Sequence, residues 1–270
     1  MISALTLTPS SPASYFPDQT LCRDWPWAVA TTAPLTIFCD FDGPLMDVCQ
    51  RYYKTYQLAL METQTYFQTQ GQALPLTALN LAEFWGMKQA KRPDRDIATQ
   101  SGLVGEHIDF FLDQVQVCVN QPLFLGEDRL QPGVRSALQQ LVNLGARLAV
   151  ITLRCQTQVV QILQQHQLSH FFSLICGTQD ALAAYENYAV CKQALLQEAI
   201  QAMGLHQDQA LWMIGDTEAD VLAAQAMQIK TIALTCGMRD YPFLQRLQPT
   251  SIQTDLTAAT QFLTKMAVAL

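Results

Sequence analysis

The hydrophobic positions along the chain change their spacing twice. Leu35–Cys39 is a short apolar run with β-branched and aromatic members, and it ends at an Asp-Phe-Asp-Gly turn, as is typical of a buried strand. Over residues 47–129 the apolar positions recur instead at helical spacing, most clearly in 49–70, 76–85 and 103–119. We therefore predict that residues 47–129 form an all-helical insertion.

Strand-like and helix-like segments alternate after Leu130. Such alternation favours right-handed βαβ units and a parallel sheet covered by helices on both faces. We predict an α/β, Rossmann-like core made of residues 34–46 and 130–270, which the helical insertion interrupts once. The later strands are expected at 147–152, 171–176, 210–215 and 229–234, and the helices at 132–144, 156–166, 190–204, 218–227 and 255–267.

Residues 1–33 differ from both of these regions. The segment up to Pro34 contains five prolines, no early positive charge and no continuous apolar stretch, so it is a poor signal peptide. We expect a loosely structured extension that Trp25 and Trp27 anchor. No apolar run in the chain approaches the roughly 18 residues that a membrane span needs, so no membrane segment is predicted.

The composition is that of a folded protein with few charges. Hydrophobic residues make up 50% and charged residues 14%, which excludes a disordered or fibrous chain. With 16 Lys and Arg against 23 Asp and Glu, the net charge of −7 lacks the basic footprint of a nucleic-acid-binding protein. None of the eight cysteines forms a C-x-x-C pair and several lie in apolar runs, which predicts reduced thiols in a cytoplasmic protein.

Polar side chains follow three of the predicted strands. Ligands of open α/β sheets bind outside the carboxyl ends of the strands, so side chains at these ends are expected to meet. Lys192, early in the helix before the strand at 210–215, is expected to join them. The strand-end residues are Asp40 and Asp42 after the first strand, Thr152 and Arg154 after the strand at 147–152, and Asp216 and Asp220 after 210–215.

Several carboxylates at one sheet edge repel one another unless a cation lies between them. Two such charges about 4 Å apart repel by roughly 4 kcal/mol at an effective dielectric constant of about 20. Mg²⁺ suits oxygen ligands with open water positions, and a metal held by few carboxylates recruits a phosphate. Lys192, Thr152 and the backbone N–H groups from Gly43 onward could contact that phosphate. An ionised carboxylate beside it is a workable nucleophile, and an aspartate two residues on could protonate the leaving oxygen and deprotonate water.

These residues carry a resemblance to a known family. Asp40–Leu45 reads D-x-D-G-x-L, Thr152 ends the strand of a second motif, Lys192 matches a third, and residues 215–220 read G-D-x-x-x-D. In these motifs the chain resembles the haloacid dehalogenase superfamily, in its phosphoglycolate phosphatase-like branch with a helical cap. The resemblance spans about residues 35–263, with the cap matching in position and helical character only.

The resemblance implies a role for each motif residue. The family's first aspartate becomes a phospho-aspartate and its second is the acid/base, which assigns Asp40 and Asp42. Mg²⁺ is bound by the first aspartate, the backbone carbonyl of the second and the acids of the last motif, here Asp216 with Asp220 in support. Thr152 and Lys192 are implied to complete the catalytic set. The family's cap closes over the site and carries specificity, as lids do in general.

The chain departs from the family pattern at two positions. Pro44 stands where a threonine is common, so that hydroxyl is absent. Gln193 follows Lys192 where phosphoglycolate phosphatase-like members often have proline. This weakens the assignment to that subgroup more than it weakens the assignment of Lys192 to the third motif. Asp42 argues against the dehalogenase and phosphonatase branches, which lack an acid at that position.

The helical insertion contains one concentration of charge, in residues 86–96. Lys88 and Arg92 are predicted to reach an anionic part of the substrate, and the competing interpretation is a solvated loop. Arg154 of the core is predicted to contact the phosphate, against the alternative of a surface arginine. Two sets are expected to be structural: the aromatic residues Tyr52, Tyr53, Tyr56, Tyr66 and Phe67, and the histidines His107, His166, His170 and His206, which show no metal-ligand spacing.

The predicted function is a Mg²⁺-dependent phosphatase that acts on a small phosphorylated metabolite. A sugar phosphomutase needs the same two aspartates, and the core motifs do not separate it from a phosphatase. A catalytically idle binding or regulatory member would need a broken motif, and none is broken. The identity of the substrate and the choice between monomer and homodimer stay open at this point.

Overall fold

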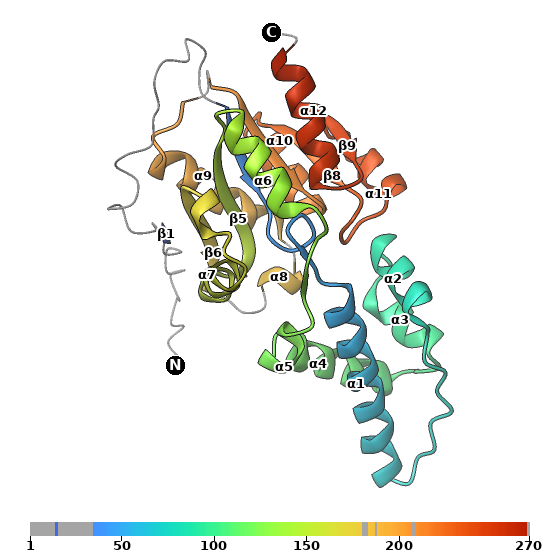
Figure 1. The fold of residues 1–270 in the computed structure, drawn as a ribbon. Helices are drawn as coiled ribbons and strands as arrows, with labels where there is room; N and C mark the ends of the chain where they lie inside the picture. The colour runs from blue at the N-terminus through green and yellow to red at the C-terminus, as the bar shows by residue number, and fades with distance from the viewer. Residues whose placement is uncertain (1–13, 16–34, 180–182, 187, 207–208, 269–270) are drawn as a thin grey trace, which may run out of the picture.

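The computed structural model describes residues 14–15, 35–179, 183–186, 188–206 and 209–268 (Figure 1). Its centre is a seven-stranded sheet in the order β1-β6-β5-β2-β7-β8-β9. Neighbouring strands pair in parallel except β1, which runs antiparallel to β6. The predicted α/β class is confirmed. The strands are β1 (Ser14–Tyr15), β2 (Thr36–Cys39), β5 (Arg147–Cys155), β6 (Leu174–Thr178), β7 (Leu211–Gly215), β8 (Lys230–Leu234) and β9 (Ser251–Gln253).

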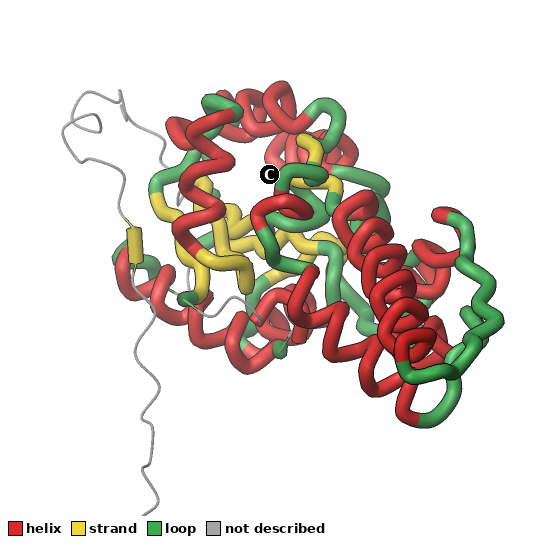
Figure 2. Tube along the Cα trace, turned by 90° about the horizontal axis from the view of Figure 1, so that it is seen from below, coloured by secondary structure: helices red, strands yellow, loops and turns green. Residues whose placement is uncertain are grey.

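Helices cover both faces of the sheet because successive side chains of a strand point to opposite faces. On β2, Ile37 and Cys39 belong to one apolar cluster and Phe38 to the other. Figure 1 and the turned view in Figure 2 show the sheet between these helical layers. One layer contains α6 (Val134–Asn143), α7 (Gln156–Gln165) and α12 (Leu256–Val268), the other α9 (Ala189–Ala202) and α10 (Glu218–Ala226), while the short α8 (Ala183–Glu186) and α11 (Tyr241–Arg246) follow β6 and β8.

The chain leaves this core through β3 (Met46–Asp47) and returns through β4 (Arg129–Leu130), which pair as an antiparallel ribbon. Two-residue strands show no periodicity, so the sequence does not predict this ribbon. Between the two strands lie helices and loops only, here called the helical block, and Figure 2 shows the block to one side of the sheet. Its helices are α1 (Cys49–Thr69), α2 (Leu81–Gln89), α3 (Asp94–Gln100), α4 (Glu106–Cys118) and α5 (Pro122–Leu125).

Several predicted element boundaries are wrong. The strand expected at 147–152 extends to Cys155. The strand expected at 171–176 begins only at Leu174. Phe171 ends a short 3-10 helix (Ser169–Phe171) and Phe172 follows it, and both are buried, so their apolar character reflects packing rather than strand structure. The helix expected from residue 76 begins only at Leu81. Asn80 accepts a hydrogen bond from the Glu83 N–H at 3.0 Å and the Glu83 carboxylate accepts one from the Asn80 N–H at 2.9 Å, so a capping box starts the helix there.

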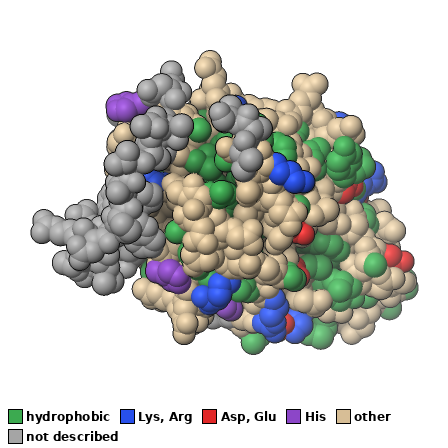
Figure 3. Space-filling model, turned by 45° about the horizontal axis from the view of Figure 1, so that its top comes forward, with side chains coloured by type: hydrophobic (Ala, Val, Ile, Leu, Met, Phe, Trp, Pro, Cys, Tyr) green, Lys and Arg blue, Asp and Glu red, His purple; other side chains and the backbone are tan. Residues whose placement is uncertain are grey.

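The expectations for residues 1–33 lie outside the described residues, except that Ser14 and Tyr15 form β1. All seven cysteines in the described part of the chain are free thiols. Among the described helices, none combines the length and apolar character that crossing a membrane requires. On the face shown in Figure 3, charged side chains lie in small scattered groups rather than as one basic surface.

Candidate active site

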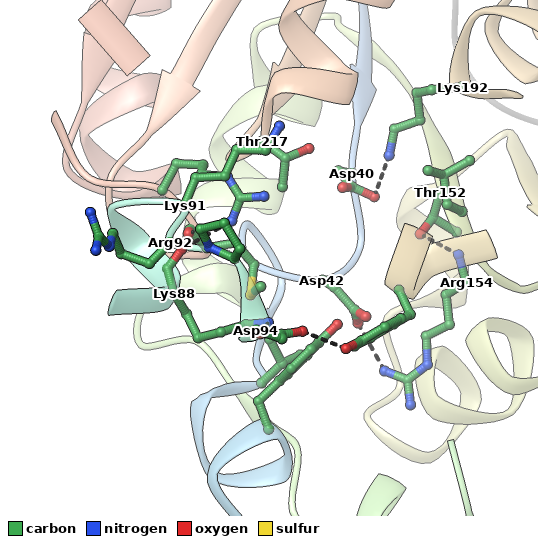
Figure 4. Close-up of a pocket in the computed structure, with 17 residues that line it drawn as sticks. Asp40, Asp42, Lys88, Lys91, Arg92, Asp94, Thr152, Arg154, Lys192 and Thr217 are labelled. Atoms are coloured by element: carbon green, nitrogen blue, oxygen red, sulfur yellow. Dashed lines mark hydrogen bonds and ion pairs between the residues drawn. The ribbon is translucent and has the colours of Figure 1, made fainter. Parts of the chain in front are cut away.

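Asp40 directly follows β2 and meets Lys192 at the carboxyl edge of the sheet (Figure 4), where Asp220 contacts the same lysine. Lys192 Nζ lies 2.8 Å from Asp40 Oδ1 and 2.8 Å from Asp220 Oδ1. Burial, followed by the charge of Asp220, raises the pKa of Asp40 to about 7. Burial alone would lower the pKa of Lys192, but the two carboxylates outweigh it and hold that pKa above its usual value. The lysine is therefore a fixed positive charge between two acids.

Asp220 is anchored by the start of α10. Its Oδ2 accepts hydrogen bonds from the Thr217 N–H at 3.0 Å, the Thr217 hydroxyl at 2.8 Å and the Asp216 N–H at 3.2 Å. Gly215 leaves space for this arrangement, since a Cβ there would lie 2.2 Å from Asp220 Cγ. With Lys192 on Oδ1, both oxygens of Asp220 are engaged, so this residue supports the site from behind.

Asp216 presents a carboxylate oxygen without a partner. The residue is fully buried, and its Oδ2 accepts the Met238 N–H at 2.6 Å. In the described part of the chain, Oδ1 has no hydrogen-bond partner. Burial, followed by the charges of Asp220 and Asp40, raises the pKa of Asp216 well above its usual value. An ionised Asp216 therefore needs a positive partner that the described side chains do not supply.

A divalent cation fits this need. One oxygen each from Asp40, Asp216 and Asp220 lies within 4.8 Å of the others, and all three residues are buried. A buried, unpaired carboxylate is costly, and an all-oxygen donor set suits Mg²⁺. Because Asp220 is already engaged by Lys192 and the backbone, Asp40 and Asp216 are the carboxylates that could hold the ion directly.

Asp42 lies at the same edge but is engaged by two arginines instead of Lys192. Arg51 Nη2 lies 2.8 Å from its Oδ2, and Arg154 Nη1 lies 2.9 Å from its Oδ1. Burial would raise the pKa of Asp42, but Arg154 and Arg51 outweigh it and hold that pKa below its usual value. Arg154 is thus buried rather than a surface residue, and within the described structure its Nη2 keeps an unused hydrogen-bond donor.

Thr152 and Gly43 are placed by the local backbone. Thr152 is buried on β5, and its Oγ1 accepts the Arg154 N–H at 3.2 Å. The Gly43 N–H donates to the Met46 carbonyl at 2.8 Å, so it closes the turn and does not face a phosphate as expected. Gly43 instead provides space, because it has φ +94° and a Cβ there would lie 2.1 Å from Asp216 Cγ.

A cavity of about 260 Å³ joins this sheet edge to the helical block. Lys88 and Arg92 line it from the block, with Lys88 Nζ 2.7 Å from Asp94 Oδ1 and Arg92, in the turn before α3, paired to Asp96 of that helix. In Figure 4 they lie across the site from Lys192 and Arg154. The fold therefore brings the predicted basic residues of the block to the same cavity as the strand-end acids.

The loop 235–240 holds the end of α2 against the core. Gln89 Nε2 donates to the Gly237 carbonyl at 3.0 Å, and the Asp240 N–H donates to the Gln89 carbonyl at 3.1 Å. The Met238 N–H of the same loop is the group that binds Asp216. One short segment thus contacts both the helical block and the buried acid.

Five further residues line or surround the site without a clear signal in the sequence. Arg239 binds Glu218 through Nε at 2.7 Å, and Lys91 Nζ lies 2.6 Å from the same carboxylate. These cations outweigh burial and lower the pKa of Glu218 to about 2. Of the five residues, only Glu218 stands inside a recognised motif. The set comprises Arg51, Asp128, Tyr185, Glu218 and Arg239.

Gly237→Ala is expected to lower the turnover number by about 100-fold, because displacements of about 1 Å at a site have effects of that size. A Cβ at Gly237 would lie 2.0 Å from Asp216 Oδ2, so the carboxylate or the loop must move. The control is Gly86→Ala on α2, where nothing lies within 4 Å of the new Cβ and alanine should stabilise the helix by about 1 kcal/mol. Wild-type turnover in both variants would contradict the close packing inferred around Asp216.

Comparison with known proteins places this chain in a family. The model of the family "Haloacid dehalogenase-like hydrolase" matches residues 37–234. The chain is 29% identical over 202 residues to a phosphoglycolate phosphatase of Aliivibrio fischeri, covering 73% of this chain and 82% of that protein. It is 23% identical over 222 residues to the pyrophosphatase PpaX of Oceanobacillus iheyensis, covering 82% and 92%.

The fold has a close counterpart among solved structures. The crystal structure of a predicted phosphatase from Clostridium acetobutylicum superposes with a TM-score of 0.61 at 19% identity, covering 87% of this chain and all of that one. At this identity the likeness concerns the fold alone. The family model spans the strands whose carboxyl ends carry the acids, from β2 to β8. The chain therefore belongs to the haloacid dehalogenase-like hydrolase family and is an enzyme of its phosphatase branch.

Proposed function

We propose that the protein is a cytoplasmic, Mg²⁺-dependent phosphatase that hydrolyses a small phosphorylated metabolite through a phospho-Asp40 intermediate. The observation that carries this proposal is the buried group of Asp40, Asp216 and Asp220, whose ligand atoms lie within 4.8 Å of one another beside Lys192. Three acids with one cation leave the site short of positive charge. Mg²⁺ would supply that charge, and the phosphate of a substrate would be drawn to it.

The first half-reaction transfers the phosphoryl group to the protein. An Asp40 carboxylate oxygen attacks phosphorus, and the bond from phosphorus to the ester oxygen breaks. Asp42, carrying the proton that it took from water in the preceding turnover, donates that proton to the departing oxygen. Lys192 sits against Asp40 and would offset the phosphate charge, and Thr152 would contribute a hydrogen bond from its hydroxyl. The buried Arg154, with its unused Nη2, would contact the phosphate from the side of Asp42.

The second half-reaction returns Asp40 to its free state. Water attacks the phosphorus of the acyl phosphate, its proton passes to Asp42, and the bond between Asp40 and phosphorus breaks to release inorganic phosphate. Asp42 starts this step ionised, which is the state that the two arginines favour in the structure. When bound, Mg²⁺ would be held by Asp40, Asp216 and the backbone carbonyl of Asp42, and it would neutralise the transferring phosphoryl group.

The cavity limits the size of the substrate. Its volume of about 260 Å³ suits a small metabolite rather than a protein or a polymer. Lys88 and Arg92 lie on the wall away from Lys192, so we infer that they contact the part of the substrate beyond its phosphate. The names of the two curated relatives suggest phosphoglycolate and pyrophosphate as the first compounds to test.

The proposal is tested with purified protein, an aryl phosphate and a panel of about a hundred phosphorylated metabolites that includes phosphoglycolate, pyrophosphate and sugar phosphates. Inorganic phosphate release is measured with Mg²⁺ and with chelator. We expect release that requires Mg²⁺ and is fastest for a small compound. Absence of Mg²⁺-dependent release from every compound would refute the assignment, and transfer to a second sugar hydroxyl instead of water would indicate a mutase.

Arg92→Ala is expected to raise KM about tenfold for the best metabolite and much less for an aryl phosphate, because only the metabolite would offer a group to this side chain. Arg95→Ala is the matched control: the side chain exposures are 60% for Arg92 and 56% for Arg95, but Arg95 pairs with Asp109 at 2.5 Å and does not line the cavity. Equal effects of Arg92→Ala on both substrates would exclude Arg92 from substrate recognition.

A further inference from the structure

Three buried side chains and the part-buried Asp42 form a closed ring of ion pairs beside the catalytic aspartate Asp40. Arg51 contacts Asp42 at 2.8 Å and Asp128 at 3.0 Å, while Arg154 contacts Asp42 at 2.9 Å and Asp128 at 2.6 Å. The side chains of Arg51, Asp128 and Arg154 are 1–2% exposed, and that of Asp42 is 16% exposed. Each arginine thus touches both carboxylates, and the ring is balanced at two positive and two negative charges.

Only part of this ring borders the cavity. Asp42 and Arg154 line it, whereas Arg51 and Asp128 do not. Arg51 also lies 3.4 Å from Asn120 Oδ1 through Nη1, which holds its guanidinium against the block. Asp128 therefore cannot exchange a proton with a substrate in the cavity, and any effect it has on the reaction must act through the arginines and Asp42.

The position of the ring in the chain explains why it concerns Asp42. Arg51 lies in the first turn of α1, just after β3, and Asp128 directly precedes β4. The Arg51–Asp128 pair therefore joins the two places where the chain enters and leaves the helical block. Arg154 belongs to β5 of the core. The carboxylate of Asp42 thus contacts Arg51 of the helical block through Oδ2 and Arg154 of the core through Oδ1.

We propose that Arg51 and Asp128 are positioning residues that fix the orientation of the Asp42 carboxylate for proton transfer. This inference rests on the proposed function, in which Asp42 exchanges the proton. A carboxylate held through both oxygens by two separate guanidinium groups has one orientation, and proton transfer is sensitive to small changes in that orientation. Asp128 acts by holding both guanidinium groups, and its removal would leave two buried arginines sharing one acid.

The test compares Asp128→Asn, Arg51→Lys and the double variant on two substrates. An alkyl phosphate needs a proton on its leaving oxygen, whereas a nitrophenyl phosphate leaves without one. The rate to compare is that of the first half-reaction, measured in a single turnover as release of the alcohol or of nitrophenol, because Asp42 acts on water in the second half-reaction whatever the substrate. We expect this rate to fall about 10–100-fold for the alkyl phosphate, a partial loss of the roughly 10²–10⁴-fold that general acid catalysis contributes, and much less for the nitrophenyl phosphate. The double variant should lose no more than the worse single variant, because the two residues act as one unit.

The chain offers a matched control for these variants. Lys54 and Glu127 also join α1 to the segment before β4, at 2.6 Å, but their side chains are 46% and 25% exposed and do not contact Asp42. Lys54→Gln and Glu127→Gln should keep wild-type turnover on both substrates. If Asp128→Asn fails to fold, Arg51→Lys keeps a buried positive charge and decides the question alone.

Several outcomes overturn the inference. Wild-type turnover of the alkyl phosphate in folded Asp128→Asn and Arg51→Lys would show that the ring does not position Asp42. An equal loss in the rate of the first half-reaction on both substrates would assign the ring a structural role only. A wild-type protein without phosphatase activity, or one in which Asp40→Asn remains active, would instead refute the proposed function before the ring is considered.

Discussion

Asp40→Asn is expected to abolish phosphatase activity while the protein remains folded. The substitution removes the oxygen nucleophile, and loss of a covalent nucleophile lowers turnover by at least about 10⁴-fold in comparable enzymes. An amide should also relieve crowding, since burial and the charge of Asp220 raise the pKa of Asp40 to about 7. Activity is measured as Mg²⁺-dependent phosphate release, and a phosphorylated wild-type protein should be trapped by acid quench and absent from the variant.

Asp47→Asn is the control for this experiment. Asp47 lies seven residues on, in β3, and its Oδ1 accepts the Cys49 N–H at 2.9 Å, which an asparagine oxygen can also do. The control should keep wild-type turnover and thermal stability. If Asp40→Asn keeps more than about 1% of wild-type activity, the loss is less than about 10²-fold instead of the expected loss of about 10⁴-fold. Another group would then carry the phosphoryl transfer.

Asp216→Asn is expected to have two opposite effects, one on activity and one on stability. Turnover should fall about 10³-fold, because a bound metal contributes several kcal/mol to charge stabilisation in the transition state. The melting temperature without metal should rise, by about 2–4 °C for each kcal/mol gained. The reason is that Asp216 is fully buried and, among the described residues, its Oδ1 has no partner, so the amide removes an uncompensated charge.

The sign of the pH dependence follows from the raised pKa of Asp216. The folded protein binds this proton more tightly than the unfolded chain, so without metal the contribution of Asp216 to stability falls as pH rises. Mg²⁺ should therefore raise the melting temperature of the wild type more at about pH 8 than at about pH 6. It should not raise the melting temperature of Asp216→Asn at either pH. Asp240→Asn, which keeps its cap on the Phe243 N–H, serves as control.

An equal Mg²⁺ shift in the wild type and in Asp216→Asn would place the ion elsewhere. A lower melting temperature of Asp216→Asn in chelator would show that the Met238 N–H already compensates the carboxylate. Either measurement is independent of turnover, so the metal site can be judged without knowing the substrate.

The sequence predicts most of the core because its elements are long and periodic. The helices at 156–166, 190–204 and 218–227 agree with α7, α9 and α10 to within two residues at each end. The prediction is poorer where local packing overrides the pattern. The buried phenylalanines before β6 have the apolar pattern of a strand without forming one. The capping box at Asn80 sets the start of α2 at Leu81, although residues 76–80 are apolar enough to belong to the helix.

Other parts of the site depend on contacts between distant segments. Arg154 and Asp42 are 112 residues apart, and Arg51 and Asn120 are 69 apart. The sequence predicts Lys88 and Arg92 near the substrate, and both line the cavity. Nothing in the sequence of residues 86–96, however, indicates that Gln89 binds the loop that contains Gly237. No periodicity or motif records such pairings.

The sequence by itself determined the α/β core and the gathering of Asp40, Thr152, Lys192 and Asp216 at one edge, because parallel strands place their carboxyl ends on the same side. The tertiary structure decided which groups those acids meet. It pairs Asp220 with Lys192 and Asp42 with Arg51 and Arg154, and among the described residues it leaves Asp216 Oδ1 without a hydrogen-bond partner. The pairs with Lys192 and Arg154 join segments that are distant in the chain, and the Arg51–Asp42 pair forms only because the helical block packs on the core.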